Sequence, residues 1–416
     1  MRSIVITGLG LVSALGDDLR SAWPRLMSGA HGVAPISRFD ACGWTTPLAA
    51  QVSDHVLWNE ARAAVPGARL GTWLFSVAVR EAMRDAGLAG APYARDRVGI
   101  AAGASVNYVH LGVLRDAWRS AREAPLRRHD AALHHPAADF WRRQGDQTAA
   151  LPAREHGLRG PRLVLDTACA ASAHAVSAAF RELRHDRADA MVAGGGCSLV
   201  QPISVLAFSR IGALSTNRDP DRASRPFDRD RDGFVMGEGG AAVVMEGREA
   251  ALRRGASIYA EVAGVGETTT AASLTDPSVD GEPEARAMTL ALEQAGLAPG
   301  DVDHVVAHGT STPRNDVAET LAIKRALGAR ARGVAVSSPK GQIGHTLAAA
   351  GACNVVIAAM AIARGEIPPT AHLEHPDPEC DLDYVPHRGR LLRVRASLAH
   401  AFAFGGHNVA IALRAV

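Results

Sequence analysis

Residues 164–180 read VLDTACAASAHAVSAAF, and residues 336–360 read VSSPKGQIGHTLAAAGACNVVIAAM. Both stretches have the same layout, with a short apolar strand, a turn, and a helix built almost entirely from small residues. A second pair of stretches shows a similar echo. VITGLGLVSA at 5–14 and EVAGVGETTT at 261–270 each carry an apolar strand into Gly-x-Gly and then into small polar residues. Such repetition predicts two halves of related layout, at 1–255 and 256–416.

Alternating strands and helices place both halves in the α/β class. If a pseudo-twofold axis relates the halves, the two small-residue helices pack against each other at its centre. The Gly8-x-Gly10 pair lacks the third glycine and the later acidic residue of a dinucleotide-binding fingerprint. Residues 2–7 are therefore interpreted as a buried strand that runs into a glycine turn.

Composition excludes several classes of protein. The 416 residues are 47% hydrophobic with a formal net charge of +2, which indicates a globular chain and gives no reason to expect nucleic-acid binding. Five scattered cysteines without a CxxC pair favour reduced thiols. The N-terminus lacks the pattern of a signal peptide, and no uninterrupted apolar run reaches the length of a membrane span, so a cytoplasmic protein is expected.

Cys169 is the first candidate for chemistry. It lies at a strand-to-helix turn, where backbone N–H groups and the helix dipole stabilise a thiolate. Small neighbours leave room for a substrate to approach it. These features favour a nucleophile over a buried structural thiol.

Four segments resemble the signature segments of the β-ketoacyl-acyl carrier protein synthases, in the elongating branch with a Cys-His-His active site. They are DTACAASAHA (166–175), AHGTSTPRNDVAE (307–319), SSPKGQIGHTLAAAG (337–351) and FAFGGHN (402–408). Three further segments agree: GLRGP at 157–161, SRPFDRDRDGFVMGEG at 224–239 and IPPTAHLEHPDPECDLDYVPH at 367–387. The resemblance covers both halves and implies a thiolase-like five-layered αβαβα fold made of two similar halves.

The resemblance also implies a reaction and its residues. Cys169 takes an acyl group from a carrier thioester, and a malonyl carrier loses CO2 to give the carbon nucleophile. Two neutral imidazoles, those of His308 and His345, would stabilise the enolate. His308 follows the strand HVVAH, and His345 is expected to begin a helix.

Further residues follow from the same segments. Lys340, one of only two lysines in the chain, is expected to pair with Glu319 and so to orient the histidines. The other lysine, Lys324, is interpreted as solvated surface. The backbone N–H groups of Cys169 and Phe404 would form an oxyanion hole, and Phe404 would also gate the acyl pocket.

Two more expectations concern the substrate arm and the gating loop. Thr310 and Thr312 match positions that bind the pantetheine arm. Ala403 replaces the first glycine of the usual Phe-Gly-Phe-Gly-Gly, which predicts a stiffer loop.

The implied partners are acyl carrier protein and a second chain, either an identical copy or a chain-length-factor-like subunit, and no cofactor is expected beyond the phosphopantetheine of the carrier. Residues 104–156, the segment from which the family lines its acyl channel and dimer interface, match the family least. Two alternatives stay open: a non-catalytic chain-length-factor-like subunit, which typically lacks the nucleophile, and a thiolase, which uses a second cysteine near the C-terminus. A metal site of His372, His375 and Cys380 is disfavoured because their spacing fits no common zinc pattern.

Overall fold

The computed structural model describes residues 2–55, 69–105 and 144–416. Ten strands form its main sheet, in the order β11-β10-β14-β15-β9-β1-β8-β6-β4-β5. The strands of the first half are β1 (Ile4–Ser13), β4 (Val98–Gly103), β5 (Arg162–Leu165), β6 (Ala190–Cys197) and β8 (Gly239–Gly247). Those of the second half are β9 (Ala260–Thr269), β10 (His304–Val306), β11 (Ala335–Ser337), β14 (Ala396–Ala403) and β15 (His407–Arg414).

Both halves place their five strands in the same order. Counted along the chain within each half, the order from the centre of the sheet outward is 1-5-4-2-3 on both sides. The directions also repeat, because the two inner pairs of each half are antiparallel and the two outer pairs are parallel. The two similar halves expected from the sequence are thereby confirmed, while their exact bounds at 1–255 and 256–416 remain a prediction.

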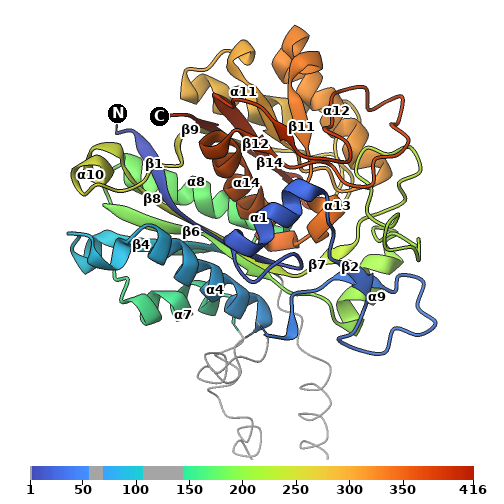
Figure 1. The fold of residues 1–416 in the computed structure, drawn as a ribbon, viewed down its shortest axis with the longest axis horizontal. Helices are drawn as coiled ribbons and strands as arrows, with labels where there is room; N and C mark the ends of the chain where they lie inside the picture. Colours follow the sequence, from blue (N-terminus) through green and yellow to red (C-terminus); the bar gives the residue numbers. More distant parts are fainter. Residues whose placement is uncertain (1, 56–68, 106–143) are drawn as a thin grey trace, which may run out of the picture.

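Helices cover the sheet in three layers (Figure 1). α4 (Leu70–Asp85) and α7 (Gln147–His156) pack on the outer face of the first half, and α11 (Glu282–Ala295) packs with α12 (Pro313–Leu327) on that of the second. α8 (Ala171–Arg184) and α14 (Ala350–Arg364) lie between the halves and contact strands of both. The strands and helices thus stack in the expected αβαβα order.

Shorter elements complete the chain. The short strands are β2 (Val33–Pro35), β3 (Leu48–Ala50), β7 (Met236–Gly237), β12 (Glu366–Ile367) and β13 (Arg390–Leu391). The short helices are α1 (Leu19–Ser28), α9 (Pro202–Arg210), α10 (Arg248–Arg253) and α13 (Lys340–Ile343), with 3-10 turns that include η4 (Ala168–Ala170) and η7 (Leu347–Ala349).

The Gly-x-Gly pairs lie inside strands, so the glycine turn expected after residue 7 is wrong. A Cβ atom on Gly8 or Gly10 would meet the carbonyl oxygens of Ala82 or Ala78 on α4 at 2.2 and 2.0 Å. In the second half, a Cβ on Gly264 or Gly266 would meet backbone carbonyls of α11 at similar distances. These glycines let a helix lie directly on the strand, which explains the repeated pattern without a dinucleotide.

The small-residue helices meet at the centre of the molecule, as predicted. A Cβ on Gly351 of α14 would lie 2.6 Å from the Cβ of Ala173 on α8, so the two backbones approach as closely as small residues allow. The Ser172 hydroxyl accepts a hydrogen bond from the Ala352 N–H at 2.9 Å. The contact fixes the start of α8, which follows Cys169 directly, against the start of α14.

The segment Leu347–Arg364 bears on the expectation about membrane spans, although Asn354 interrupts its apolar run. Its 18 residues have a mean hydropathy of 1.8, so by length and composition it is apolar enough to cross a membrane. However, 83% of it is buried inside the protein. It is the core helix between the two sheet halves, and its apolar character on all sides reflects this burial.

Candidate active site

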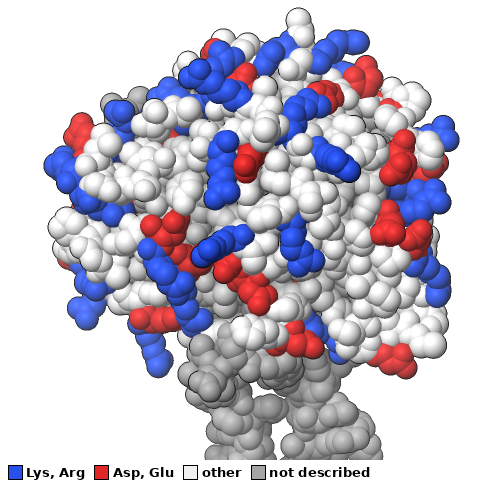
Figure 2. Space-filling model, viewed as in Figure 1, with Lys and Arg blue, Asp and Glu red and all other residues white. Residues whose placement is uncertain are grey.

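One cavity of about 370 Å3 contains side chains from both halves of the chain. Its lining includes six of the eight residues that the sequence predicted for the site: Cys169, His308, Thr310, Thr312, His345 and Phe404. The other two, Lys340 and Glu319, lie behind it. The charged side chains that Figure 2 shows on the visible face are of both signs and intermixed.

Cys169 lies in the 3-10 turn η4 at the start of α8, and Ala168 before it has a φ of +49°. Leu347, which begins η7 in the second half, has a φ of +48°, so the halves repeat even this left-handed residue. An L-residue adopts this conformation only where the surrounding structure imposes it. Here it turns the chain sharply from the end of β5 and places the thiol in the cavity.

The thiol is less acidic than its position at a helix start predicts. Burial raises the pKa of Cys169 to about 12, against the lowering effects of the Lys340 charge and of the backbone N–H groups of Cys169 and Phe404. Desolvation of the thiolate therefore outweighs the favourable dipoles. Cys169 is protonated in the free protein, and all five cysteines of the chain are free.

His345 does not begin a helix, contrary to the expectation. It lies after α13, in a bridge in which its N–H donates to the Val235 carbonyl at 2.7 Å and its carbonyl accepts from the Gly237 N–H at 2.9 Å. Its ring Nδ1 accepts a hydrogen bond from the Leu347 N–H at 3.2 Å. Because Nδ1 accepts, the neutral ring carries its proton on Nε2, which makes Nε2–H a donor.

His308 faces His345 across the site. Their ring centroids are 5.3 Å apart and the rings are nearly perpendicular, at 83°. The Lys340 ammonium donates a hydrogen bond to the backbone carbonyl of His308, so the lysine holds the segment that carries this ring. Nδ1 of His308 is buried and has no partner within the part of the chain that the structure describes, which leaves it available to a ligand.

Both rings are kept neutral by their surroundings. Burial lowers the pKa of His308 and of His345 well below the ordinary value, and the nearby Lys340 charge lowers each further. Burial also lowers the pKa of Lys340 to about 8, while the Glu319 carboxylate opposes that change. At neutral pH the site thus presents two uncharged imidazoles beside a mostly protonated ammonium group.

The expected ion pair between Glu319 and Lys340 is wrong. The fully buried Glu319 carboxylate accepts the backbone N–H groups of His308 and Gly309, each at 2.7 Å, and the His400 Nδ1–H at 3.0 Å. With both oxygens engaged, the carboxylate makes no ion pair with Lys340, whose ammonium turns to the His308 carbonyl instead. Both side chains still position His308, because each forms a hydrogen bond with the backbone of His308.

Sequence reasoning missed two residues of this network. His400 lies on β14 two and four positions before Phe402 and Phe404, and its alternation with these aromatic residues was the available signal. Asp316 is fully buried and accepts the N–H groups of Thr310 and Ser311, which fixes the loop between β10 and α12. Neither residue lines the cavity.

The remaining predicted residues, Thr310, Thr312 and Phe404, also line the cavity. The hydroxyl oxygens of Thr310 and Thr312 are 2.9 Å apart. The Phe404 ring stacks on Phe208, with centroids 6.4 Å apart. Ala403 ends β14 opposite His407 without a positive φ, so alanine fits there, and the left-handed conformations fall on Gly405 and Gly406.

The other candidates are separated by the fold. Lys324 lies at the surface, as expected, where its half-exposed side chain forms an ion pair with Asp381. The three residues of the disfavoured zinc site do not converge, since His372 and His375 belong to different clusters and Cys380 is buried elsewhere. Most of the divergent segment 104–156 lies outside the described residues, so its expected role stays a prediction.

The buried histidines predict loss of stability in acid. Burial lowers the pKa of His304 on β10 to about 3, whereas an unfolded histidine has a pKa of about 6.5. Between these values the unfolded chain binds a proton that the folded chain does not, so the free energy of unfolding falls as the pH falls. Each such histidine contributes a slope of about 1.4 kcal/mol per pH unit.

We expect thermal unfolding midpoints to drop steeply between pH 6.5 and pH 4.5. A His304→Gln variant should have a shallower pH slope by roughly one histidine, and the same substitution at the exposed His185 should leave the slope unchanged. Equal slopes in all three proteins would contradict this interpretation.

Two family models match the chain. Residues 1–251 match the beta-ketoacyl synthase N-terminal domain, and residues 259–374 match the beta-ketoacyl synthase C-terminal domain. The 3-oxoacyl-[acyl-carrier-protein] synthase 2 of Synechocystis sp. is 40% identical over 417 residues, which cover 99% of this chain and 98% of the relative.

Solved structures agree. A type II polyketide synthase acyl-carrier protein in complex with its ketosynthase, bound to the hexaketide, matches with a TM-score of 0.88 and 30% identity over 100% of both chains. The ishigamide ketosynthase/chain length factor matches with a TM-score of 0.84 and 31% identity, over 100% of this chain and 99% of that one.

Proposed function

The chain belongs to the beta-ketoacyl synthase family, and from that premise we propose that Cys169, His308 and His345 together perform its condensation reaction. The chain is a 3-oxoacyl-[acyl-carrier-protein] synthase, an acyltransferase that joins an acyl group to a malonyl unit with loss of CO2. One observation carries the assignment of roles. A thiol and two neutral imidazoles, drawn from both halves of the chain, face one cavity of about 370 Å3.

The first step loads the acyl group onto Cys169. The sulfur attacks the thioester of an acyl carrier, the new S–acyl bond replaces the old one, and the thiol proton passes to the departing carrier thiolate. The exchange is nearly neutral in energy because one thioester replaces another. A thiol with a pKa of about 12 is mostly protonated and therefore a weak nucleophile, so it reacts slowly with other electrophiles before substrate is bound.

The second step makes the carbon nucleophile. When a malonyl thioester loses CO2, the electron pair of the broken bond forms an enolate whose oxygen needs hydrogen-bond donors. Nε2–H of His345 supplies one, since its Nδ1 is already bonded to the Leu347 N–H. We assign the second donor to His308, whose ring lies 5.3 Å from that of His345, centroid to centroid.

Neutral donors suit this step. An imidazolium would bind the malonyl carboxylate as an ion pair and so stabilise the ground state, whereas neutral donors favour the enolate over the carboxylate. The burial and the Lys340 charge that keep both rings uncharged thus serve the chemistry.

In the third step the enolate carbon attacks the acyl-Cys169 carbonyl. The backbone N–H groups of Cys169 and Phe404, which both lower the pKa of the Cys169 sulfur, would bind the oxygen that becomes negative. We assign the paired hydroxyls of Thr310 and Thr312 to the pantetheine arm of the carrier, and Phe404 to the gate of the acyl pocket. Lys340 and Glu319 act as positioning residues.

The partners follow from the reaction and from the sheet. We propose that acyl carrier protein delivers both substrates, without a further cofactor, and that a second chain pairs with this one. β5 forms one end of the ten-stranded sheet, and its Val164 is 38% exposed, which offers an unpaired edge. The second chain is either an identical copy or a chain-length-factor-like subunit, and the complex works in the cytoplasm in fatty acid or type II polyketide synthesis.

Two other functions fit the site less well. A non-catalytic chain-length-factor-like subunit would have no need of a nucleophile, a histidine pair and the lysine together. A thiolase requires a second cysteine in the site, but Cys380, the last cysteine of the chain, does not line the cavity.

Acyl loading tests the proposal. Incubation with an acyl-acyl carrier protein should add the mass of one acyl group per chain in intact-protein mass spectrometry, and peptide mapping should place it on Cys169. Alkylation with iodoacetamide should be slow, because the thiol is protonated, but once it is complete it should block the transfer. Acylation elsewhere in the chain, or none with any chain length tried, would refute the assignment.

A further inference from the structure

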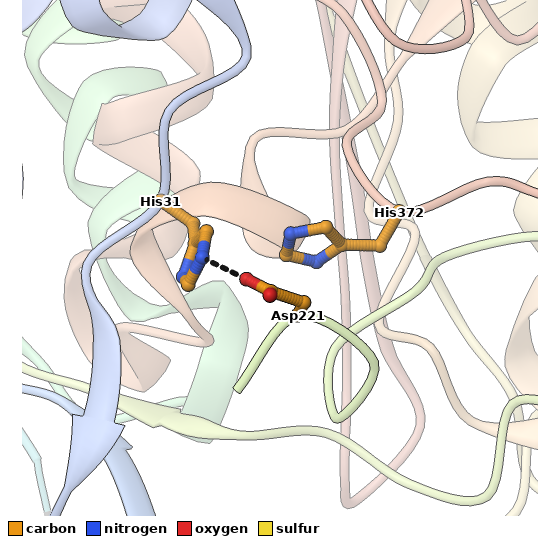
Figure 3. Close-up of side chains that lie close together, drawn as sticks. All are labelled: His31, Asp221 and His372. Carbon is orange, nitrogen blue, oxygen red and sulfur yellow. Dashed lines mark hydrogen bonds and ion pairs between the residues drawn. The ribbon is translucent and has the colours of Figure 1, made fainter. Parts of the chain in front are cut away.

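Three potential metal ligands meet on the surface of the protein, from three separate segments of the chain. His31 follows α1, Asp221 belongs to the loop after α9, and His372 belongs to the loop after β12 (Figure 3). Their ligand atoms all lie within 4.8 Å of one another. The His31 Nε2 lies 2.8 Å from the Asp221 carboxylate, and the two imidazole centroids are 4.8 Å apart.

We propose that His31, Asp221 and His372 bind one divalent transition-metal ion of the zinc class. Two imidazoles and a carboxylate are ligands that Zn2+ prefers, and three protein ligands leave a fourth position for water. The proposal does not depend on the condensation chemistry, because none of the three residues lines the catalytic cavity.

The surroundings of His372 prepare it for this role. Its Nδ1–H donates a hydrogen bond to the Ser224 carbonyl at 2.9 Å. That bond leaves the lone pair on Nε2 and fixes the ring, which is how metal-bound histidines are usually oriented. The residue also adopts a φ of +63°, an uncommon conformation that the loop imposes.

His31 requires a small adjustment. Without metal, the Val33 N–H donates to Nδ1 at 3.3 Å, so Nε2 carries the proton and donates it to Asp221. Metal binding at Nε2 requires that proton to move to Nδ1, which gives up a long hydrogen bond in a half-exposed loop. Asp221, with 76% of its side chain exposed, then exchanges the hydrogen bond from His31 for a bond to the metal and remains open to water.

A bound ion would fasten the segments that surround α13. The Gly32 N–H donates to the Gln342 carbonyl at 2.8 Å, and the Gln342 side chain donates back to the Leu26 and Ala30 carbonyls. On the other side, the Ser224 hydroxyl donates to the Lys340 carbonyl at 2.6 Å. The His31 loop and the support of His372 thus both hold the helix that carries Lys340.

A second cluster offers a matched control. Asp228, Asp230 and His375 also lie close together, but the Asp228 carboxylate already accepts three backbone N–H groups, from Asp230, Glu374 and His375. A carboxylate engaged in this way has little capacity left for a metal. Loss of His375 should therefore leave metal binding unchanged.

The test is titration with zinc chloride and cobalt chloride in a Cys42→Ser, Cys169→Ala background, which removes the exposed thiol and the cavity thiol as competing ligands. Calorimetry should find one Zn2+ per chain, zinc should raise the thermal midpoint, and Co2+ should give visible d–d absorption. His31→Ala, His372→Ala and Asp221→Asn should each weaken binding by at least about tenfold, and His375→Ala should not.

Circular dichroism establishes whether each variant is folded. If a histidine variant does not fold, Asp221→Asn still tests the site, because the exposed Asp221 side chain can be replaced without disturbing the core. Zinc binding that survives all three substitutions, or that His375→Ala removes equally, would overturn the proposal. So would equal binding of Mg2+, which prefers oxygen ligands.

Discussion

Replacement of Cys169 by alanine is expected to abolish the acyl-enzyme and, with it, all formation of 3-oxoacyl product. No other described residue of the cavity lining carries a thiol, so no group can take over the acyl chain. Decarboxylation of malonyl-acyl carrier protein should continue in this variant, because the two imidazoles remain in place and the missing sulfur even enlarges the cavity. Product formation is measured by chromatography and CO2 release with labelled malonyl-acyl carrier protein.

Cys380→Ala is the matched control for this prediction. That thiol is also buried, at 1% exposure against 6% for Cys169, but it does not line the cavity, so its loss should leave both loading and product formation intact. An acyl adduct that persists in Cys169→Ala would show that the nucleophile is another residue.

Replacement of His308 or His345 by alanine is expected to lower CO2 release by a factor of about 10² to 10³ each. Each substitution removes one donor to the enolate oxygen in a buried site, where water replaces it poorly. Glutamine variants should recover part of the loss, because the amide N–H is also a neutral donor. Initial rates of CO2 release at saturating malonyl-acyl carrier protein give the comparison.

An exposed histidine serves as the control here. His185 caps the C-terminal end of α8, whereas Cys169 lies just before its N-terminal end. The His185→Ala variant should therefore release CO2 at the wild-type rate. If the glutamine variants were as inactive as the alanine variants, a role in proton transfer would replace that of a neutral donor.

Much of the fold could be predicted from the sequence because the chain repeats itself. The paired stretches at 5–14 and 261–270 proved to be β1 and β9, the equivalent first strands of the two halves. The glycines within them were misinterpreted as a turn. Glycine marks close backbone approach as well as turns, and only the position of α4 shows which applies at Gly8 and Gly10.

The sequence predicted which residues form the site but not which hydrogen bonds they make. Opposite charges on Glu319 and Lys340 suggested an ion pair, yet backbone N–H groups and His400 engage that carboxylate first. Backbone donors do not appear in a sequence pattern, because every residue except proline carries one. The high pKa of the Cys169 thiol could not be predicted either. Its cause is burial by both halves of the chain, which depends on the complete fold.

The convergence of side chains from distant loops is also invisible in the sequence. His372 was considered with its neighbours His375 and Cys380, but its actual companions are 341 and 151 positions earlier, at His31 and Asp221. Only the folded chain brings these three together.

The central claim is that Cys169 and the histidine pair divide the reaction between acyl transfer and enolate stabilisation. Its most direct test is acyl loading of the His308→Ala and His345→Ala variants, timed by mass spectrometry on the same preparations used for CO2 release. The account predicts that both variants still load Cys169, within about tenfold of the wild-type rate, while their CO2 release falls by about 10² or more. Variants that release CO2 at the wild-type rate yet fail to load would contradict it, and would make the histidines activators of the thiol.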